Sequence, residues 1–383
     1  MIVSHIKLKN WRNFRNAEAD LGRRMFLVGP NASGKSNFLD AFRFLRDIAR
    51  PGGGLQKAVE DRNGISKIRC LAARKEPQVG IDVTLSSVPD GKVLWRYSIA
   101  LKQESRGSRN PYLEHEKIWK DGKLILDRPD SKDREDSRRL TQTHLEQISA
   151  NYEFREIAEF FESISYLHMV PQLLRHQNAF SGPDIRDDPF GRNFIERLAR
   201  TTEGTRNTRL RKIEKALRLV VPQLKALSMT IDDAGKPHLE VTEEHWRLMC
   251  PRLQEEEFSD GTLRLIGFLW SLLEGDSLLL LEEPELYLHT AIIRRLPGII
   301  WRIQTKKKRQ TLISTHSYDL LLDNGIGGEE VLVLIPDSEG TKIRTAASLS
   351  DVRALLESGI SVAEATLPRT EPRDINQLSL FND

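Results

Sequence analysis

Eight residues near the N-terminus have the types and the spacing that hold a phosphate group. Residues 29–36 read Gly-Pro-Asn-Ala-Ser-Gly-Lys-Ser and fit the pattern G-x-x-x-x-G-K-[ST]. Small residues let backbone N–H groups curl around phosphate oxygens, while Lys35 supplies a cation and the Ser36 hydroxyl a ligand for Mg²⁺. The sequence therefore predicts a nucleotide-binding loop with these contact residues: Gly29, Asn31, Ala32, Ser33, Gly34, Lys35, Ser36 and Asn37.

Two acids follow a second apolar run. Leu278–Leu281 is followed at once by Glu282 and Glu283. Neighbouring side chains on a strand point to opposite faces, so the two carboxylates cannot do the same job. We assign Glu282 to Mg²⁺, and Glu283 to orienting and deprotonating an attacking water. The alternative is a pair of surface acids past a strand, which the phosphate-binding loop in the same chain disfavours.

The elements that must position these groups alternate between strands and helices. Met25–Val28 is a short apolar run that stops at Gly29, and the apolar residues from Phe38 to Leu45 have helical spacing. Strand, loop and helix therefore follow one another. Three later apolar runs alternate with helical segments, as parallel β/α units do: Leu278–Leu281, Thr311–Ser314 and Val331–Ile335.

Outside the two motifs, the chain predicts an N-terminal strand, an antiparallel meander from Val79 to Leu126 and then a helical insertion. Alternating apolar residues and the hairpin signal at Asp121-Gly122 indicate strands at Ile2–Leu8, Val79–Leu85, Val93–Leu101, near Ile118 and at Leu124–Leu126. Helical spacing covers Thr141–Phe161 and Asn193–Val220, with a strand at Ile164–Val170 between them. The charged run Asp127–Arg139 predicts a solvated loop.

Composition excludes several classes of protein. The 383 residues are 39% hydrophobic and 30% charged, which is typical of a soluble globular chain with a sizeable core. The net charge of +3 is too mild to indicate nucleic-acid binding by itself. Cys70 and Cys250 lack metal-ligand spacing and predict reduced thiols. No signal peptide and no apolar run of about 20 residues is seen, so we expect a cytoplasmic protein without a membrane partner.

The order of the motifs resembles that of ABC-type P-loop ATPases, and the details resemble the OLD/RecF/SMC-like branch. A segment Phe258-Ser-Asp-Gly-Thr262 lies between the two motifs above, and Ile313-Ser-Thr-His316-Ser317 follows them. Glu282–His289 resembles that branch's acidic-Pro-x-x-x-Leu-His segment, and Asn10–Arg15 resembles its N-terminal Asn-Phe-Arg segment. The resemblance spans residues 1 to about 335 and implies ATP and Mg²⁺ as cofactors.

The resemblance implies an α/β fold: an ABC-type ATPase head with a mixed sheet, an antiparallel β-meander lobe and an inserted helical lobe. The expected divisions are an N-terminal ATPase lobe at 1–175, the inserted lobe at 176–257, a C-terminal ATPase lobe at 258–367 and a flexible tail at 368–383.

Further roles are carried over from the family. Ser259 and Gly261 would contact the γ-phosphate of a nucleotide held by the other subunit of a homodimer, His316 would be the switch histidine, and Gln172 the Q-loop glutamine. Catalysis would then use Glu283, His316 and Lys35. Taken alone, Ser259 or Asp260 is a helix N-cap and His316 a structural histidine. Two departures are Asp260, where transporter relatives have Gly, and Glu282, where Asp is commoner.

What the ATPase drives is a family-level expectation. The chain lacks the heptads of long coiled-coil arms and a recognisable nuclease segment after residue 335. It therefore resembles the stand-alone ATPase of two-component systems, frequently phage-defence modules, in which a separate nuclease-like (TOPRIM-like) protein is the effector. The alternatives are a RecF-like repair ATPase, a transporter-type ABC motor, and a structural dimer that binds ATP without useful turnover.

Two surface features bear on partners. Basic residues at Lys306–Arg309 and at Arg206, Arg209, Arg211 and Lys212 could contact DNA phosphates near the nucleoid, although a solvated turn is the commoner reading of the first cluster. The tail segment Gln377–Phe381 resembles the peptide by which bacterial replication and repair proteins bind the sliding clamp. The alternative is a tail docked on its own core.

Overall fold

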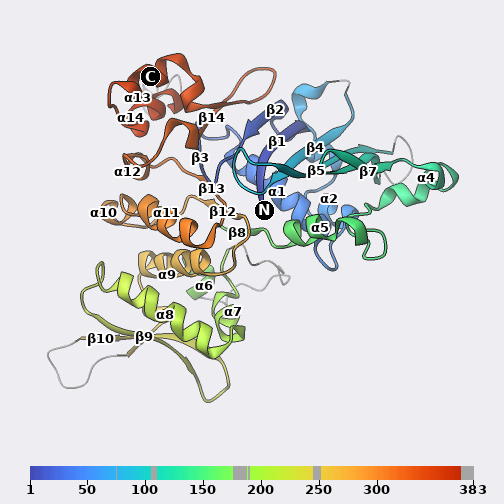
Figure 1. The fold of residues 1–383 in the computed structure, drawn as a ribbon. Helices are drawn as coiled ribbons and strands as arrows, with labels where there is room; N and C mark the ends of the chain where they lie inside the picture. Colours follow the sequence, from blue (N-terminus) through green and yellow to red (C-terminus); the bar gives the residue numbers. More distant parts are fainter. Residues whose placement is uncertain (75, 105–109, 176–187, 189, 245–251, 372–383) are drawn as a thin grey trace, which may run out of the picture.

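The computed structural model describes residues 1–74, 76–104, 110–175, 188, 190–244 and 252–371 (Figure 1). Its strands are β1 (Ile2–Trp11), β2 (Phe14–Asp20), β3 (Arg24–Val28), β4 (Val79–Ser86), β5 (Val93–Gln103), β6 (Pro111–Lys120), β7 (Lys123–Arg128), β8 (Ser165–Leu167), β9 (Leu224–Ile231), β10 (Pro237–Glu243), β11 (Arg252–Gln254), β12 (Leu279–Glu282), β13 (Thr311–Ser314), β14 (Val331–Ile335) and β15 (Lys342–Thr345). Its α-helices are α1 (Lys35–Ala49), α2 (Leu55–Glu60), α3 (Ile65–Ile68), α4 (Ser131–Glu135), α5 (Arg155–Glu162), α6 (Pro171–Arg175), α7 (Phe194–Arg200), α8 (Glu203–Leu217), α9 (Asp260–Leu273), α10 (Thr290–Ile293), α11 (Leu296–Lys307), α12 (Tyr318–Leu321), α13 (Ser350–Glu357) and α14 (Val362–Thr366).

A mixed sheet in the order β15-β14-β3-β13-β12-β8 lies at the centre of the molecule. Neighbours from β14 to β8 are parallel, and β15 adds an antiparallel edge. All five residues of β3 and all four of β13 are buried, as the continuous apolar runs predict for strands covered on both faces. The carboxyl ends of β3, β12 and β13 therefore meet at one edge of the sheet.

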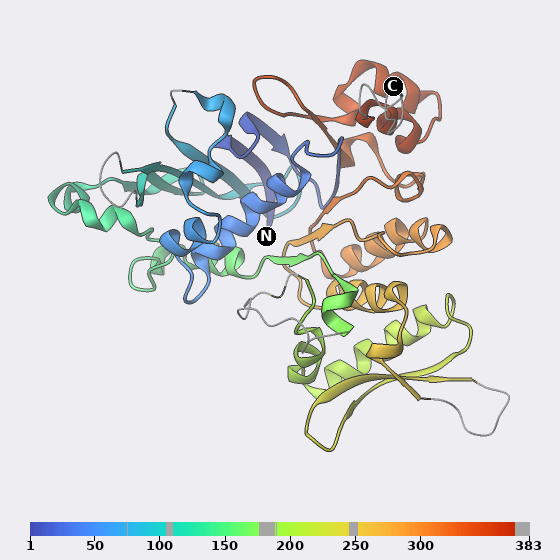
Figure 2. The same ribbon diagram turned by 180° about the vertical axis from the view of Figure 1, so that it is seen from behind.

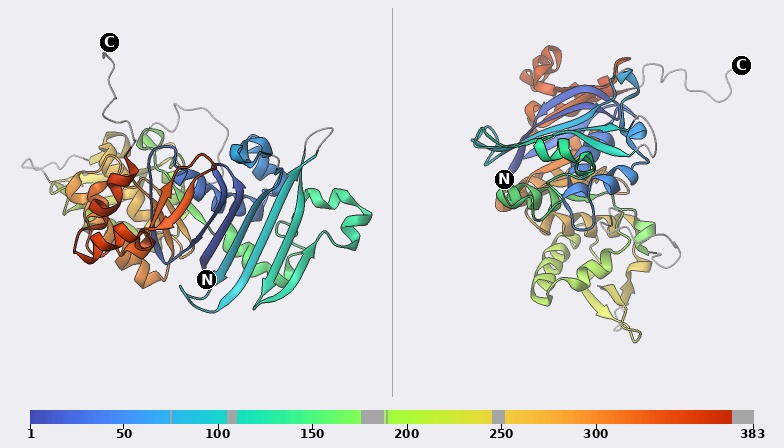
Figure 3. Two further views of the ribbon diagram at one scale, coloured as in Figure 1. Left: turned by 90° about the horizontal axis from the view of Figure 1, so that it is seen from above. Right: turned by 90° about the vertical axis from the view of Figure 1, so that its right-hand side faces the viewer.

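A second sheet, in the order β2-β1-β4-β5-β6-β7, forms the predicted antiparallel meander. It lies beside the first sheet and curves over α1 and α5 (Figures 2 and 3). Residues of α1, of this sheet and of one face of the central sheet share a single apolar cluster, in which Trp11 packs on Phe44 with ring centroids 5.2 Å apart. The helix that follows the phosphate-binding loop is thus held on several sides.

The insertion after α6 packs beneath α9 on the other side of the central sheet (Figure 1). Its helices α7 and α8 and its strands join a second apolar cluster with α9, α11 and the opposite face of the central sheet. The described part of the insertion also carries a three-stranded antiparallel sheet, β11-β10-β9, which helical spacing alone did not predict.

The charged run at 127–139 is mostly exposed, as its composition predicts, but it is not only a loop and it buries two of its charged side chains. It contains α4, and the side chains of Arg128 and Asp133 are fully buried. Arg128 donates to Glu116 at 3.0 Å and to Asp133 at 2.9 Å, and Glu116 also accepts backbone N–H bonds from His144 and Leu145. These ion pairs and hydrogen bonds compensate the two charges, which is why Arg128 and Asp133 can be buried within an otherwise exposed segment.

Other predicted elements are shorter than expected. The helix predicted at Thr141–Phe161 begins only at Arg155, the strand at Ile164–Val170 is confined to Ser165–Leu167, and the helix at Asn193–Val220 is divided into α7 and α8. Cys70 is a buried thiol. Cys250 and the clamp-like segment Gln377–Phe381 lie outside the described residues.

Part of the basic cluster at Lys306–Arg309 is structural. Arg309 is 1% exposed and donates to the backbone oxygens of Ser271 and Ser277, while Lys307 Nζ donates to those of Leu273 and Gly275 at 2.5 and 2.7 Å. These two cations satisfy the carbonyls at the end of α9 and the turn after it. The expectation of a solvated, phosphate-contacting patch is therefore wrong for both residues.

Among the described residues, no helix is long and apolar enough to cross a membrane.

Candidate active site

The phosphate-binding loop joins β3 to α1 in the conformation that its glycines allow. Gly34 precedes α1 with φ of +103°, a region that favours glycine. A Cβ on Gly34 would lie within 2.6 Å of the Asn13 amide, so the position has no room for a side chain. Lys35 Nζ donates to the backbone oxygens of Gly29 at 3.0 Å and Pro30 at 3.2 Å. Burial lowers the pKa of Lys35 to about 8, although Glu283, Glu282 and Glu285 pull it upwards.

Asn13, from the segment that resembles the family's Asn-Phe-Arg, fixes this loop from outside. Its Nδ2 donates to the Ser33 backbone oxygen at 2.6 Å and to Thr341 Oγ1 at 2.7 Å, and its Oδ1 accepts from Asn37 at 3.0 Å. Asn13 thus connects the loop to the start of α1 and to the turn before β15. The segment was singled out only by resemblance, and its contacts give it a physical role.

Glu282, at the end of β12, faces the start of α1. Its Oε1 accepts a hydrogen bond from the Ser36 hydroxyl, and its Oε2 accepts one from the Tyr166 hydroxyl. Tyr166 comes from β8, the neighbouring strand, and the Arg43 guanidinium lies 4.2 Å from its ring centroid. Burial and the nearby Glu282 raise the pKa of Tyr166, so the phenol keeps its proton and donates. No sequence motif indicated Tyr166; only the pairing of β8 with β12 brings it to the site.

Glu283 turns away from Glu282 and towards His316. Its φ is +44°, its backbone N–H donates to the Ser314 oxygen at 3.0 Å, and Arg264 donates to its carbonyl at 2.6 Å. These backbone contacts direct its side chain, and Oε1 lies 3.7 Å from His316 Nε2. Partial burial and the charge of Lys35 lower the pKa of His316, so its imidazole is neutral at neutral pH.

Glu285 holds the strand end that carries His316. Its Oε1 accepts from Thr315 Oγ1 at 2.5 Å and from the His316 backbone N–H at 3.4 Å. Its carboxyl is buried, and desolvation raises its pKa. Glu285 therefore fixes the position of Thr315 and of the His316 backbone. It was not among the residues predicted for the site.

One pocket of about 410 Å³ brings most of the predicted residues together. It is lined by Asn31, Ala32, Gly34, Lys35, Ser36, Asn37, Glu282, Glu283, Ser314 and His316. The hydroxyl of Ser36 and the carboxylate of Glu282 meet in it, and oxygen ligands of this kind are those that Mg²⁺ prefers. The donor set therefore fits the cation that the phosphate-binding loop implies.

Five predicted nucleotide contacts do not line this pocket: Gly29 and Ser33 of the phosphate-binding loop, and Gln172, Ser259 and Gly261. Gln172 Nε2 donates to Asp260 Oδ2 at 2.8 Å, so the structure places Gln172 beside the signature segment and not at the phosphates. Ser259 accepts from the Thr262 N–H at 3.2 Å and caps α9, as the alternative interpretation expects, and its side chain remains exposed. A Cβ on Gly261 would lie 2.8 Å from the Tyr287 carbonyl, which explains a glycine there.

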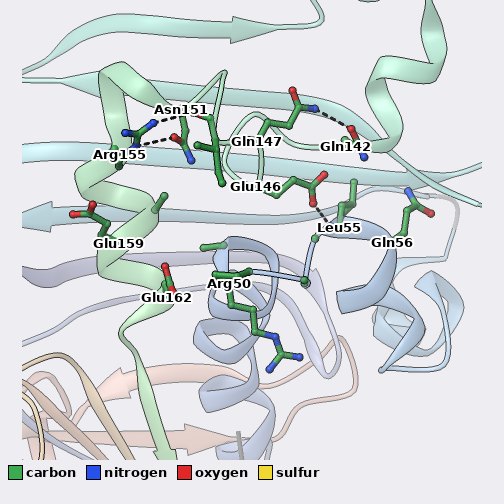
Figure 4. Close-up of a pocket in the computed structure, with 17 residues that line it drawn as sticks. Arg50, Leu55, Gln56, Gln142, Glu146, Gln147, Asn151, Arg155, Glu159 and Glu162 are labelled. Atoms are coloured by element: carbon green, nitrogen blue, oxygen red, sulfur yellow. Dashed lines mark hydrogen bonds between the residues drawn. The ribbon is translucent and has the colours of Figure 1, made fainter. Parts of the chain in front are cut away.

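A second cavity, of about 640 Å³, lies at the other end of α1 (Figure 4). Glycines 52–54 and α5 line it, and Glu146 accepts backbone N–H bonds from Leu55 at 2.5 Å and Thr143 at 2.9 Å. Desolvation raises the pKa of Glu146 to about 7. None of the predicted site residues reaches this cavity.

The fold and the pocket define a P-loop ATPase of the ABC/SMC-like class. A family model described as "AAA domain, putative AbiEii toxin, Type IV TA system" matches residues 24–323, most of the chain, and the chain belongs to this family. No sequence match was found among curated proteins.

Two solved structures are similar in fold. The crystal structure of an Smc head bound to the C-winged helix domain of ScpA has a TM-score of 0.54 at 14% identity, over 90% of this chain and 98% of that chain. An Smc head domain with an extended coiled coil, bound to the C-terminal domain of ScpA and derived from Pyrococcus furiosus, has a TM-score of 0.51 at 12% identity, over 93% and 99% of the two chains. These structures confirm the predicted ABC-type head.

Proposed function

We propose that the protein binds Mg-ATP and hydrolyses it between two copies of the chain. The observation that carries this proposal is the single pocket in which Lys35, Ser36, Glu282, Glu283 and His316 meet. A cation, two oxygen ligands and a carboxylate beside a neutral imidazole are the groups that phosphoryl transfer to water needs. A purely structural ATP-binding dimer would not require Glu283 there.

Each residue has a distinct role in this proposal. Lys35 and the loop amides neutralise and position the β- and γ-phosphates. Ser36 and Glu282 would hold Mg²⁺, which would supply charge neutralisation at the phosphate oxygens. Glu283 orients the water and takes its proton, and His316, 3.7 Å away, stabilises the position of that carboxylate.

The second copy would complete the site through Ser259. This residue is exposed at the N-terminus of α9 and does not line the pocket of its own chain. The exposed hydroxyl and the first-turn N–H groups of α9 are suited to the γ-phosphate of a nucleotide on a facing subunit. ATP binding would therefore drive dimerisation, and ATP hydrolysis would allow the two chains to separate.

Phosphate release combined with light scattering tests the proposal. Wild-type protein should hydrolyse ATP, and the Glu283→Gln protein should accumulate as an ATP-bound dimer. An absence of phosphate release by well-folded, ATP-binding wild-type protein would refute the enzymatic function. If the Glu283→Gln protein stays monomeric in the presence of ATP, this result would refute the site shared between two chains but not the enzymatic function.

We further propose that the nucleotide cycle switches a separate effector in the cytoplasm, in an anti-phage or toxin–antitoxin setting. The family description, which refers to a toxin and a type IV TA system, supports this setting. An effector with nuclease or TOPRIM-like chemistry, DNA, and the sliding clamp through Gln377–Phe381 remain proposed partners. Purification of the tagged chain from its host with and without ATP, followed by identification of the bound protein, tests the switch; an ATP-independent or absent partner would contradict it.

A further inference from the structure

A groove of about 360 Å³ runs along α9 on the side of the molecule that carries the insertion. α9 packs against both α8 and α11, which form the two walls of the groove. The lining residues are Lys212, Ile213 and Ala216 of α8, Leu269 and Leu273 of α9, and Ile299, Ile303, Lys306 and Lys307 of α11. None of these residues belongs to the nucleotide pocket.

The floor and walls of the groove are apolar. Ala216, Leu273, Ile299 and Ile303 are only partly buried, while Leu269 beneath them is 5% exposed. Adjacent half-buried apolar side chains at a concave surface are typical of a site that another apolar surface covers. The volume is at the small end of the roughly 300–1,000 Å³ range of binding pockets, so it suits a few side chains and not a whole domain.

The rim of the groove is positively charged. Lys212 and Lys306 are exposed on opposite walls. Lys307 also lines the groove, with its Nζ donating to the backbone oxygens of Leu273 and Gly275. Burial lowers the pKa of Lys307, and the neighbouring cations Arg309, Arg209 and Lys212 lower it further, against an opposing effect of Asp276. Three lysines and no acid line the groove, so its rim favours an anionic partner.

We propose that this groove binds an acidic amphipathic helix of a partner protein. Apolar side chains at helical spacing would enter between α8 and α11, and Asp or Glu residues beside them would meet Lys212 and Lys306. The groove is walled by helices whose backbone groups are already paired, so it offers no strand edge for an extended peptide. A second copy of the chain would oppose these lysines with the same lysines, which disfavours self-association through this face.

Two designed peptides test the proposal on the full chain. The first is a fluorescein-labelled 18-residue helix with Leu at i, i+3, i+4 and i+7 and Glu at the flanking positions; the second has Lys in place of each Glu. Fluorescence anisotropy should show binding of the acidic peptide at least about tenfold tighter than that of the basic peptide, because opposite charges across an interface favour binding and like charges oppose it. Ile303→Glu should weaken the acidic peptide about tenfold or more, and the double change Lys212→Glu, Lys306→Glu should reverse the preference.

Trp301→Glu is the matched control. Trp301 is 54% exposed on the same helix, two residues from Ile303, but it does not line the groove. The Trp301→Glu substitution should leave peptide binding unchanged. All variants should still bind ATP, which verifies that they are folded. The proposal would be overturned if both peptides bound equally well, or if Ile303→Glu left the affinity of the acidic peptide unchanged.

Three further outcomes would assign the groove to another occupant and overturn the proposal. The first is a DNA duplex that displaces the acidic peptide and loses affinity on Lys212→Glu. The second is tighter binding of the peptide, by more than tenfold, to a chain truncated after residue 371, because this would mean that residues 372–383 occupy the groove in the full chain. The third is a nucleotide-independent dimer that Ile303→Glu dissociates.

Discussion

Replacement of Glu283 by Gln isolates the chemical step from nucleotide binding. Gln has nearly the same size as Glu, and the bonds that shape this turn come from the backbone: the N–H of residue 283 to Ser314 and its carbonyl from Arg264. Lys35 and the phosphate-binding loop keep their contacts. The substitution therefore removes a proton acceptor while the pocket retains its shape.

Loss of a general base costs about 10²–10⁴-fold in rate. Because each tenfold corresponds to about 1.36 kcal/mol, the activation free energy should rise by about 2.7–5.4 kcal/mol. We expect single-turnover phosphate release to slow by this factor, while ATP affinity, measured by calorimetry, changes less than about threefold.

Glu285→Gln is the matched control, with the same change two residues further along. The acceptor oxygen that Thr315 and His316 use can be supplied by the Gln amide, so turnover should fall less than about tenfold. Turnover by Glu283→Gln within tenfold of wild type would refute its assignment as the base. An equal loss in both variants would show that the effect is structural.

Four further predictions follow from the described contacts. A mixture of Lys35→Ala and Ser259→Arg chains should recover part of the hydrolysis that each lacks alone, since one shared site per heterodimer stays intact; a folded but inactive mixture would contradict the shared site. Tyr166→Phe should weaken Mg²⁺-dependent ATP binding by roughly 10–100-fold and leave Mg²⁺-free binding unchanged, because it removes the donor that orients Glu282; equal Mg²⁺ titrations would refute this role. Arg309→Leu should lower the free energy of unfolding by about 2–4 kcal/mol in urea titrations, whereas the exposed neighbour change Lys308→Leu should alter it by less than about 0.5 kcal/mol; equal effects would show that the two carbonyl bonds of Arg309 contribute little. Because the folded chain holds the Glu146 proton up to a pH of about 7 while the unfolded chain releases it near its ordinary pKa of 4.5, this group makes the protein less stable as pH rises from about 4.5 to 7; the melting temperature of Glu146→Gln should decline less over that interval, and parallel pH curves would refute the contribution.

The sequence predicted the parts of the site that depend on local patterns. The phosphate-binding loop, the acids Glu282 and Glu283 at the end of β12, and His316 just beyond β13 each follow an apolar run, so strand ends could be located and their meeting point inferred. Tyr166 could not be found in this way. It reaches Glu282 only because β8 pairs with β12, and strand order is not encoded in periodicity.

Charge was the least informative signal. Arg128, Asp133 and Arg309 stand in runs that composition assigns to solvent, yet all three are buried. Their burial depends on partners that lie elsewhere in the chain. Arg128 donates to Glu116, and Arg309 donates to the backbone oxygen of Ser271. The position of Gln172 could not be predicted either. The local segment Val170-Pro171-Gln172 does not indicate that Gln172 donates to Asp260.

The strand order of the central sheet has a consequence for the synthesis of the chain on the ribosome. β3, which leads into the phosphate-binding loop, pairs with β13 and β14, whose residues are made about 300 positions later. The Asn13 bond to Thr341 adds a link from the same late region to the same loop. A nascent chain that has exposed only its N-terminal lobe can form the meander but not the sheet edge that carries the nucleotide. We therefore expect the nucleotide site to form only after the residues of β13 and β14 have been made.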